Sequence, residues 1–242
     1  MTTTIPAHDW PTPLLLPGQA ASPPGPVDLT LMYVLHAAFR RDLAAFADAA
    51  THTPIDDRDA WARLAERWDL FAELLHHHHT GEDAGLWPLL RERTDDQGRQ
   101  VLADMEAEHA QIDPILAASA TGLRRLAHTA DEDARAALVV RLVAAKESLA
   151  RHLGHEESDA IALVQQLLTP EDWRGLDEEY FAVKHLPFRT VLKLVPWVMY
   201  ELPAPVQQRV VSTAPAALRL VWRLTRAGFA RRERRIFAHR SA

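Results

Sequence analysis

Two histidine–glutamate pairs with helical spacing constrain this chain more than any other feature of its sequence. His78 and Glu82 are four residues apart, and so are His152 and Glu156. Residues four apart on an α-helix face the same side, so each pair offers an imidazole and a carboxylate to one point in space. The apolar residues that precede the two pairs keep the same offsets, and this predicts that both pairs lie on buried helix faces. The aligned positions are Leu64, Trp68, Phe71 and Leu75 in one segment and Leu138, Leu142, Ala145 and Leu149 in the other.

Two further histidines repeat at nearly the same interval. His36 and His109 are 73 residues apart, and His78 and His152 are 74 residues apart. Each half of residues 1–169 therefore reads as a helical hairpin with one lone histidine and one His-x-x-x-Glu pair. We expect an all-α fold: an up-down four-helix bundle with two-fold pseudosymmetry, in which inward side chains of facing helices build a metal site.

Turn residues place the expected elements. Residues 1–26 contain seven prolines and predict a flexible or extended leader. Residues 27–169 would form the bundle, with helices at about 28–50, 54–91, 99–128 and 131–168. Asp28 is the expected N-cap of the first helix, Pro54 the start of the second, and Pro114 a kink in the third.

Residues 170–242 predict a helical C-terminal extension packed on the bundle. Thr169-Pro170 is typical of a capped helix start, and later prolines divide the region into three or four short helices. Residues 1–169 hold 14 Lys/Arg against 26 Asp/Glu, whereas residues 170–242 hold 13 against 7. This contrast suggests that the positive segment packs against the negative one.

The basic run from Arg231 to Arg235 has several readings. It could contact nucleic acid, an anionic lipid surface or the acidic part of its own chain. A solvated helix end is the simplest explanation, because cations are favourable near a helix C-terminus. The run has no interleaved aromatic residues and no nucleic-acid-reading motif, so the sequence gives no support for a nucleic-acid partner.

The amino-acid composition limits which metal sites and catalytic groups the chain can contain. The chain has no cysteine, which excludes disulfides, iron–sulfur clusters, thiolate zinc sites and cysteine nucleophiles. Imidazole with carboxylate suits iron, zinc, manganese or copper, and a single structural zinc would leave two of six ligands unexplained. The first residues lack a basic segment followed by an apolar one, and no apolar run is long enough to span a bilayer, so we expect a cytoplasmic protein. Oligomeric state is not readable from the sequence.

With these residues in view, residues 27–169 resemble the hemerythrin-like, or HHE cation-binding, family. The similar features are Tyr33-Val34-Leu35-His36, the stretch from His78 to Glu82-Asp83 followed by Leu86-Trp87-Pro88, the pair Glu108-His109, and His152-Leu153-Gly154-His155-Glu156-Glu157. The resemblance implies a non-haem diiron centre with two irons per chain and a bridging oxo or hydroxo group. It further implies His36, His78, His109 and His152 as terminal ligands and Glu82 and Glu156 as bridging carboxylates.

Neighbouring side chains have more ordinary readings. In the run His76-His77-His78-His79 only one helical phase points inward, so we expect His77 and His79 to flank the site and His76 to be solvated. His155 could pair with Asp159 at the surface. Tyr33, one turn before His36, reads as a boundary aromatic residue that could also donate to a bound oxygen species.

Asp113 is the main departure from the oxygen-carrier pattern. Carrier hemerythrins place a second histidine four residues after the third-helix histidine, and here that position is Asp113. An anionic ligand or an open position there should favour the ferric state and turnover over oxygen storage. Asp113 is equally explained as the residue before Pro114 at a helix kink.

The leading functional hypothesis is a diiron protein that binds and reduces a small oxidant, namely hydrogen peroxide, oxygen or nitric oxide, with electrons from an unidentified donor. One alternative is an iron- or oxygen-responsive sensor or interaction module without turnover. The other is a diiron oxygenase acting on an organic substrate, which would need a pocket beside the metals.

Overall fold

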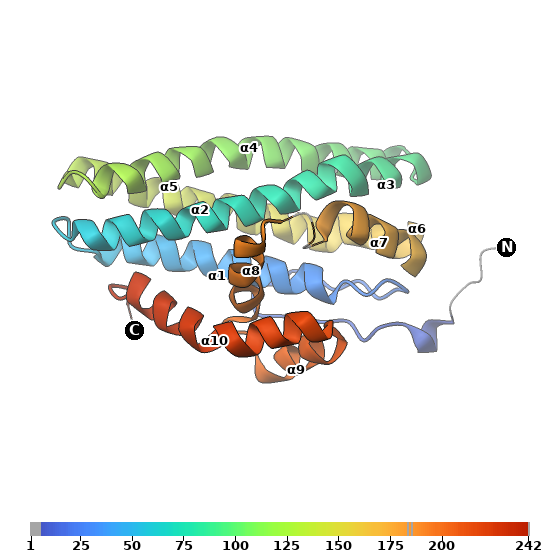
Figure 1. Ribbon diagram of the computed structural model, residues 1–242. Coiled ribbons are helices and arrows are strands. Elements are labelled where there is room, and N and C mark those ends of the chain that lie inside the picture. The colour runs from blue at the N-terminus through green and yellow to red at the C-terminus, as the bar shows by residue number, and fades with distance from the viewer. Residues whose placement is uncertain (1–5, 183, 185, 242) are drawn as a thin grey trace.

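Four long helical rods form the body of the molecule in the computed structural model, which describes residues 6–182, 184 and 186–241. The rods run up and down as neighbours, and no β-strand occurs among the described residues (Figure 1). The first is α1 (Thr30–His52) and the third is α4 (Asp96–Leu126). The second joins α2 (Arg58–Gly81), the π-helix η2 (Glu82–Leu86) and α3 (Trp87–Arg93), and the fourth joins α5 (Glu132–His155), the π-helix η3 (Glu156–Ala160) and α6 (Ile161–Leu167). The predicted helical bundle with extra C-terminal helices is confirmed.

Aspartate caps set the starts of α2, α4 and α5, whereas the N-cap of α1 is Leu29 and not the predicted Asp28. Asp57, Asp95 and Asp131 each accept a hydrogen bond from the backbone N–H three residues later, so α2, α4 and α5 begin directly after them. The start predicted at Pro54 is therefore wrong. Pro54 lies in the turn before α2, where its carbonyl accepts a hydrogen bond from the Trp61 indole.

Two π-helical turns interrupt the second and fourth rods at equivalent places. η2 begins at Glu82 and η3 begins at Glu156, the carboxylates of the two pairs. Single π-turns inside α-helices are rare and are frequently found at functional sites. The pseudosymmetry of the sequence thus extends to the backbone conformation.

Apolar cores lie on both sides of these π-turns. One contains the large buried side chains Phe39, Phe46, Trp61, Trp68 and Phe71, and the other contains Met32, Leu86, Trp87, Leu90 and Met105. Burying an aliphatic or phenyl side chain of this size stabilises a fold by roughly 1.5–3 kcal/mol. The polar residues of the two pairs are therefore held between well-packed layers.

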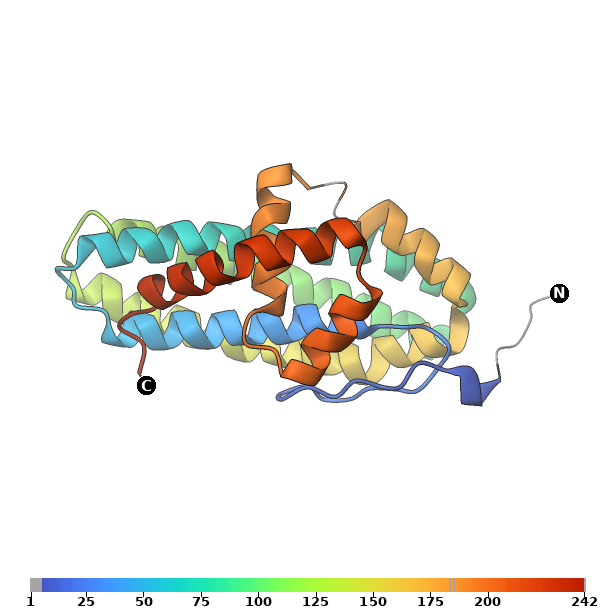
Figure 2. The same ribbon diagram turned by 60° about the horizontal axis from the view of Figure 1, so that its bottom comes forward.

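The C-terminal region lies across one side of the bundle. It comprises α7 (Pro170–Leu176), the π-helix η4 (Asp177–Phe181), α8 (Phe188–Met199), α9 (Ala204–Thr213) and α10 (Ala216–Ile236). α8 packs on α1, and α10 crosses α8 and also contacts α2 (Figure 2). A helix of 21 residues is longer than the short helices predicted here, because no proline follows Pro215.

A buried ionic network joins α10 to the bundle. Arg67 on α2 donates through Nε to Glu233 on α10, at 2.9 Å, and through Nη2 to Asp42 on α1, at 2.6 Å. The Trp197 indole on α8 donates to the same Asp42, at 2.7 Å. Burial would raise the pKa of Asp42, but Arg67 and Arg41 outweigh it and hold that pKa below its usual range.

The charges in this contact between α10 and the bundle are the reverse of those predicted. The predicted pairing of a basic C-terminal segment with an acidic bundle does not hold α10, since the joining ion pair uses an arginine of the bundle and a glutamate of α10. In the part of the chain that the structure describes, none of the seven arginines of α10 forms an ion pair with an acidic side chain. They remain uncompensated at the surface.

The N-terminal segment runs extended along the bundle before α1. The Ala20 N–H donates to Glu157 Oε2, at 2.7 Å, and Gln165 exchanges two hydrogen bonds of 3.0 Å with the backbone of Val27. Leu16 and Val27 are buried. Among the described residues, no helix is long and apolar enough to cross a membrane.

Candidate metal centre

Seven buried side chains form two adjacent groups inside the bundle. His36, His78, Glu82 and Glu156 form one group, and His79, His109 and His152 form the other. In each group, one candidate ligand atom per residue lies within 4.8 Å of the others. All six metal-ligand residues predicted from the two pairs and the lone histidines are therefore brought together, and His79 joins them.

Both glutamates reach between the two groups. Glu82 has Oε1 3.3 Å from Nε2 of His78 and Oε2 3.6 Å from Nε2 of His109. Glu156 Oε2 lies 3.3 Å from Nε2 of His36 and 4.0 Å from Nε2 of His152. Each carboxylate thus faces one imidazole of each group.

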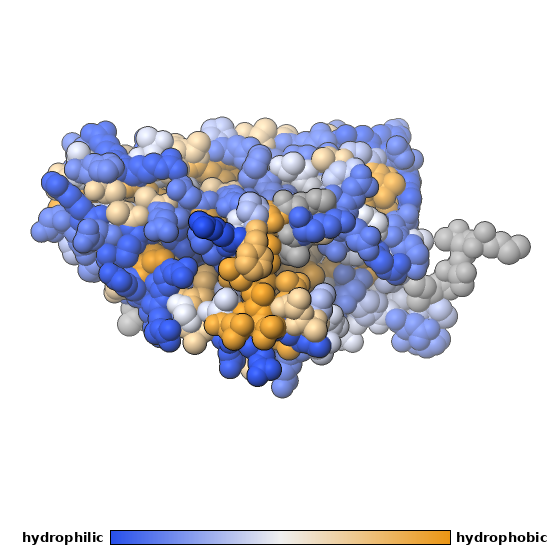
Figure 3. All heavy atoms as spheres, in the orientation of Figure 1, coloured by the Kyte–Doolittle hydropathy of each residue, from blue (hydrophilic) through white to orange (hydrophobic). Residues whose placement is uncertain are grey.

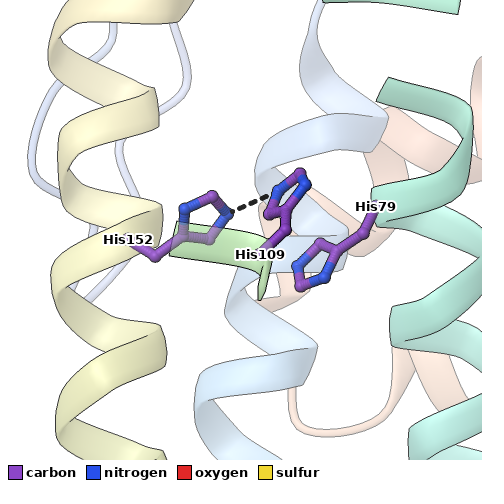
Figure 4. Close-up of side chains that lie close together, drawn as sticks. All are labelled: His79, His109 and His152. Atoms are coloured by element: carbon purple, nitrogen blue, oxygen red, sulfur yellow. Dashed lines mark hydrogen bonds between the residues drawn. The ribbon is translucent and has the colours of Figure 1, made fainter. Parts of the chain in front are cut away.

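The second group consists of three imidazoles from three helices. Figure 4 shows His79 on α2, His109 on α4 and His152 on α5 converging on one point. The rings of His79 and His109 are stacked, with centroids 3.9 Å apart, and the Nε2 atoms of His109 and His152 are 3.2 Å apart.

Carboxylates on the far side of three imidazoles fix which nitrogen carries the proton. Nδ1 of His109 donates to Asp83 at 2.8 Å, and Nδ1 of His152 donates to Glu108 at 2.8 Å. Both Nε2 atoms therefore carry lone pairs that face each other, an arrangement that a cation beside them would explain. Such carboxylate–histidine pairs are usual behind metal-ligating histidines.

His36 has the same support. Its Nδ1 donates to Glu157 at 3.0 Å, and Arg40 donates to both oxygens of that carboxylate. Burial would raise the pKa of Glu157, but the hydrogen bonds from His36 and Arg40 outweigh it and hold the pKa below its usual range. Glu157 therefore stays ionised and keeps the proton of His36 on Nδ1.

Two of the three supporting acids, Asp83 and Glu157, act crosswise between the two hairpins, whereas Glu108 holds His152 of its own hairpin. Asp83 follows Glu82 in the first hairpin and holds His109 of the second. Glu157 follows Glu156 in the second hairpin and holds His36 of the first. The π-turn that begins at each glutamate thus carries two consecutive acids with different contacts.

The seven residues of the two groups suit a bound cation. All four carboxylate oxygens of Glu82 and Glu156 are buried without a hydrogen-bond partner, as is Nε2 of His79. Leaving such groups unpaired is costly, and ionised carboxylates most of all. Burial and the neighbouring Glu156 raise the pKa of Glu82 well above its usual value, and burial lowers the pKa of His78, His79 and His152. The metal-free site therefore resists carrying charge, and bound cations would relieve the cost.

His79 is the residue that sequence reasoning missed as a ligand candidate. The spacing of His78 and Glu82 predicts one inward phase, with His79 only flanking the site. In the structure His79 follows the buried Leu75 by four residues in α2 and is buried beside His78. Its counterpart in the second hairpin is Leu153, also buried, so the pseudosymmetry gave no signal for it.

Asp113 belongs to neither group. It is exposed on α4, where it lines a surface cavity with His76, and Pro114 is accommodated within the helix. Its weaker candidacy as a ligand therefore has no geometric support. The third imidazole of the second group comes instead from His79.

The remaining candidate side chains from the sequence lie around the site. His155 donates to Glu108 at 3.0 Å and lies 3.4 Å from Asp159, so the predicted pair is present and is linked to His152 through Glu108. Tyr33 is buried rather than at the boundary, and burial raises its pKa. His76 is exposed and His77 is half-buried.

Aromatic side chains close the site on the side of the C-terminal region. Phe181 of η4 fills the space above Gly81, where an added Cβ would come within 2.6 Å of its ring, and Tyr180 fills the space above Gly85 in the same way. Phe39 lies against His78, with ring centroids 5.4 Å apart. The surface cavities found near α10, near the leader and between α2 and α4 are lined by none of the seven residues.

Comparison with known families agrees with this geometry. The family described as the hemerythrin HHE cation binding domain matches residues 27–164, more than half of the chain. Comparison with curated proteins and with solved structures gives no significant match.

Proposed function

Because this chain belongs to the hemerythrin HHE cation-binding family, we propose that its site holds two irons and that the protein binds and reduces a small oxidant. The observation that carries the proposal is the position of Glu82. Its two oxygens face imidazoles of different groups and have no hydrogen-bond partner, as expected of a carboxylate that bridges two cations.

The proposed ligand roles follow from the two groups. His36 and His78 would bind the first ion, and His79, His109 and His152 the second, with Glu82 and Glu156 shared. Two carboxylates partly neutralise two dications, and five neutral imidazoles complete the donor set. This set suits iron but does not exclude other first-row metals.

The chemistry of the proposal is that of a reducible metal pair. When bound, two irons would supply the electrons and the Lewis acidity needed to bind and reduce hydrogen peroxide, oxygen or nitric oxide. The protein would keep the imidazole protons on Nδ1 through Asp83, Glu108 and Glu157, so that Nε2 stays free to ligate. Phe39 and Phe181 would exclude water and bulky molecules from the His78 side.

The closed site disfavours the oxygenase alternative. An organic substrate would need a cavity next to the seven residues, whereas two surface cavities of about 370 and 260 Å³ are lined by other residues. Small oxidants need only narrow access. This is why a small molecule is the proposed substrate class.

Reversible oxygen binding without turnover is the second candidate, and His79 favours it. The absence of an imidazole at Asp113 disfavours oxygen storage, but in the structure His79 supplies a third imidazole beside His109 and His152. A histidine-rich, carboxylate-poor set favours reversible binding. An oxygen-responsive module would use the same property.

Metal analysis tests the shared premise. Iron-loaded protein should contain about two irons per chain and show an oxo-bridge charge-transfer band, and the doubly substituted His78→Ala/His152→Ala protein should lose both features. His76→Ala is the matched control, because His76 is exposed on the same helix. Retention of both irons by the double variant would refute the proposal.

Oxidant consumption separates the two candidates. Reduced, iron-loaded protein mixed with hydrogen peroxide should convert each peroxide to two waters with two electrons and two protons, and repeat this while a chemical reductant is present. Repeated oxygenation and deoxygenation without net electron loss, together with no peroxide consumption, would instead establish the reversible binder.

A further inference from the structure

The surface formed by α8 and the first half of α10 exposes large apolar side chains. Phe188 is 71% exposed, Leu220 is 55% exposed and Leu224 is 75% exposed. Figure 3 shows apolar surface gathered over α8 and the start of α10 rather than scattered. A contiguous apolar patch on a solvent-exposed face marks an interaction site more often than scattered apolar residues do.

Arginines surround this apolar surface. Arg219, Arg223 and Arg226 recur at helical spacing beside Leu220 and Leu224, and all three are exposed. Among the described residues none of the three forms an ion pair, and Arg226 lies only over the neighbouring Trp222 ring. We call the face made by Phe188, Leu220, Leu224 and these arginines the α8–α10 face.

The excess of positive charge extends beyond the face itself. Residues 186–241 contain eleven Lys/Arg and two acidic residues, Glu201 and Glu233. Glu233 is buried against Arg67 and cannot neutralise the surface. Residues 1–169 carry the opposite excess, so the molecule has a strongly uneven charge distribution that would orient it in an electric field.

The charge and the apolar side chains of the α8–α10 face together indicate what kind of partner it binds. A nucleic acid would use the arginines but leave the leucines and Phe188 in water. A second copy packed on the same face would bring the arginines of one copy against those of the other, with the exposed Glu201 and Glu73, which accepts from Thr190 of α8, as nearby counter-charges. An anionic bilayer satisfies both features, because apolar side chains enter the interface while arginine stems extend to the phosphates.

We infer that the α8–α10 face docks this protein peripherally on anionic lipid surfaces. α10 lies in the plane of the interface with Leu220 and Leu224 inserted, and Phe188 adds a second apolar anchor. The acidic bundle faces away from the lipid, so electrostatic attraction and repulsion favour the same orientation. This inference is independent of the metals and of their chemistry.

Vesicle flotation of the full chain tests the inference. Phosphatidylcholine vesicles with and without 30% phosphatidylglycerol are compared at low and high salt. Each arginine near an anionic surface contributes about fivefold to partitioning, so Arg219→Gln/Arg223→Gln/Arg226→Gln should weaken binding by up to about 100-fold. Leu220→Ser/Leu224→Ser should weaken it by at least about tenfold, since two apolar side chains no longer enter the interface.

Matched controls lie on another helix. Val140→Ser/Val143→Ser removes exposed apolar side chains of α5, and Arg141→Gln removes an exposed charge between them, so neither should change binding. All substituted residues are at the surface, and unchanged thermal melting would show that the variants fold.

Three results would overturn the inference. The first is equal binding to neutral and anionic vesicles. The second is no binding to anionic vesicles, and a dimer seen by light scattering that Leu220→Ser/Leu224→Ser dissociates would then identify a second copy as the occupant. The third is binding to a duplex oligonucleotide that depends on the arginines but not on the leucines.

Discussion

Replacing His79 with leucine should have opposite effects on the metal-free and the iron-loaded protein. The equivalent position of the second hairpin is Leu153, which is fully buried, so the interior of this fold already accepts leucine there. In the metal-free protein the substitution removes a buried nitrogen without a hydrogen-bond partner. In the loaded protein it removes a proposed ligand.

The size of each effect can be worked from the contacts. Removing an orphaned buried polar atom stabilises a protein by about 1–3 kcal/mol. Losing the stacking of His79 on His109 costs about 0.5–1.5 kcal/mol. The metal-free variant should therefore gain about 1 kcal/mol, or about 2–4 °C in Tm for a protein of this size. A tenfold loss of iron affinity would remove about 1.4 kcal/mol of metal-dependent stabilisation.

Thermal melting of chelator-treated and iron-loaded samples measures both quantities. The difference in Tm between loaded and metal-free protein should shrink by at least about 3 °C in His79→Leu. It should be unchanged in His76→Leu, the exposed neighbour on the same helix. If the His79→Leu protein kept two irons and the full metal-dependent rise in Tm, then His79 would not be a ligand.

Three further predictions concern the surroundings of the site. In metal-free protein, Glu82→Gln should become increasingly more stable than the wild type as pH rises above about 4.5. Burial and Glu156 raise the folded pKa of Glu82, so the contribution of protonated Glu82 to wild-type stability is lost as pH rises through that folded pKa. Thermal melts of both proteins across pH measure this difference. Arg67→Met should cost about 3–5 kcal/mol in urea unfolding, since it leaves the buried carboxylate of Glu233 without its arginine and removes one of the two arginines that contact Asp42. Gly81→Ala should speed iron removal by a chelator, because its Cβ would come within 2.6 Å of the Phe181 ring and displace it.

Matched substitutions give these predictions their controls. Arg124→Met breaks an exposed pair with Asp69 and should cost no more than about 1 kcal/mol. Gly175→Ala adds a Cβ to open space in α7 and should leave iron release unchanged. A flat pH dependence of the difference between Glu82→Gln and wild type would show that Glu82 is not held neutral in the metal-free fold.

The bundle and most of the site could be read from the sequence because both depend on local periodicity. Spacing of three and four residues fixes which side chains share a helix face, and this rule brought His36, His78, His109 and His152 inward. It missed His79, which follows the buried Leu75 by four residues in α2 and therefore shares the inward face with His78. The buried face is wide enough to hold both neighbouring histidines, and spacing from His78 and Glu82 alone does not reveal this.

The C-terminal region was harder for a different reason. Net charge suggested an acidic surface against a basic one, but burial depends on individual pairs with desolvated partners. One arginine of the bundle and one glutamate of α10 form the buried contact, and the arginines of α10 stay in solvent. Counts of charge over seventy residues do not reveal which single residue enters a core.

The crosswise bonds of Asp83 and Glu157 have a consequence for how such a bundle could arise. Each group of candidate ligands includes a side chain from each hairpin, and two of the orienting acids, Asp83 and Glu157, also act across the hairpins. One hairpin alone therefore holds only part of each ligand group, and the site is complete only when the second hairpin packs against it. An ancestor half this length would have needed to dimerise before it could retain a cation, and tandem duplication would have made that partnership permanent.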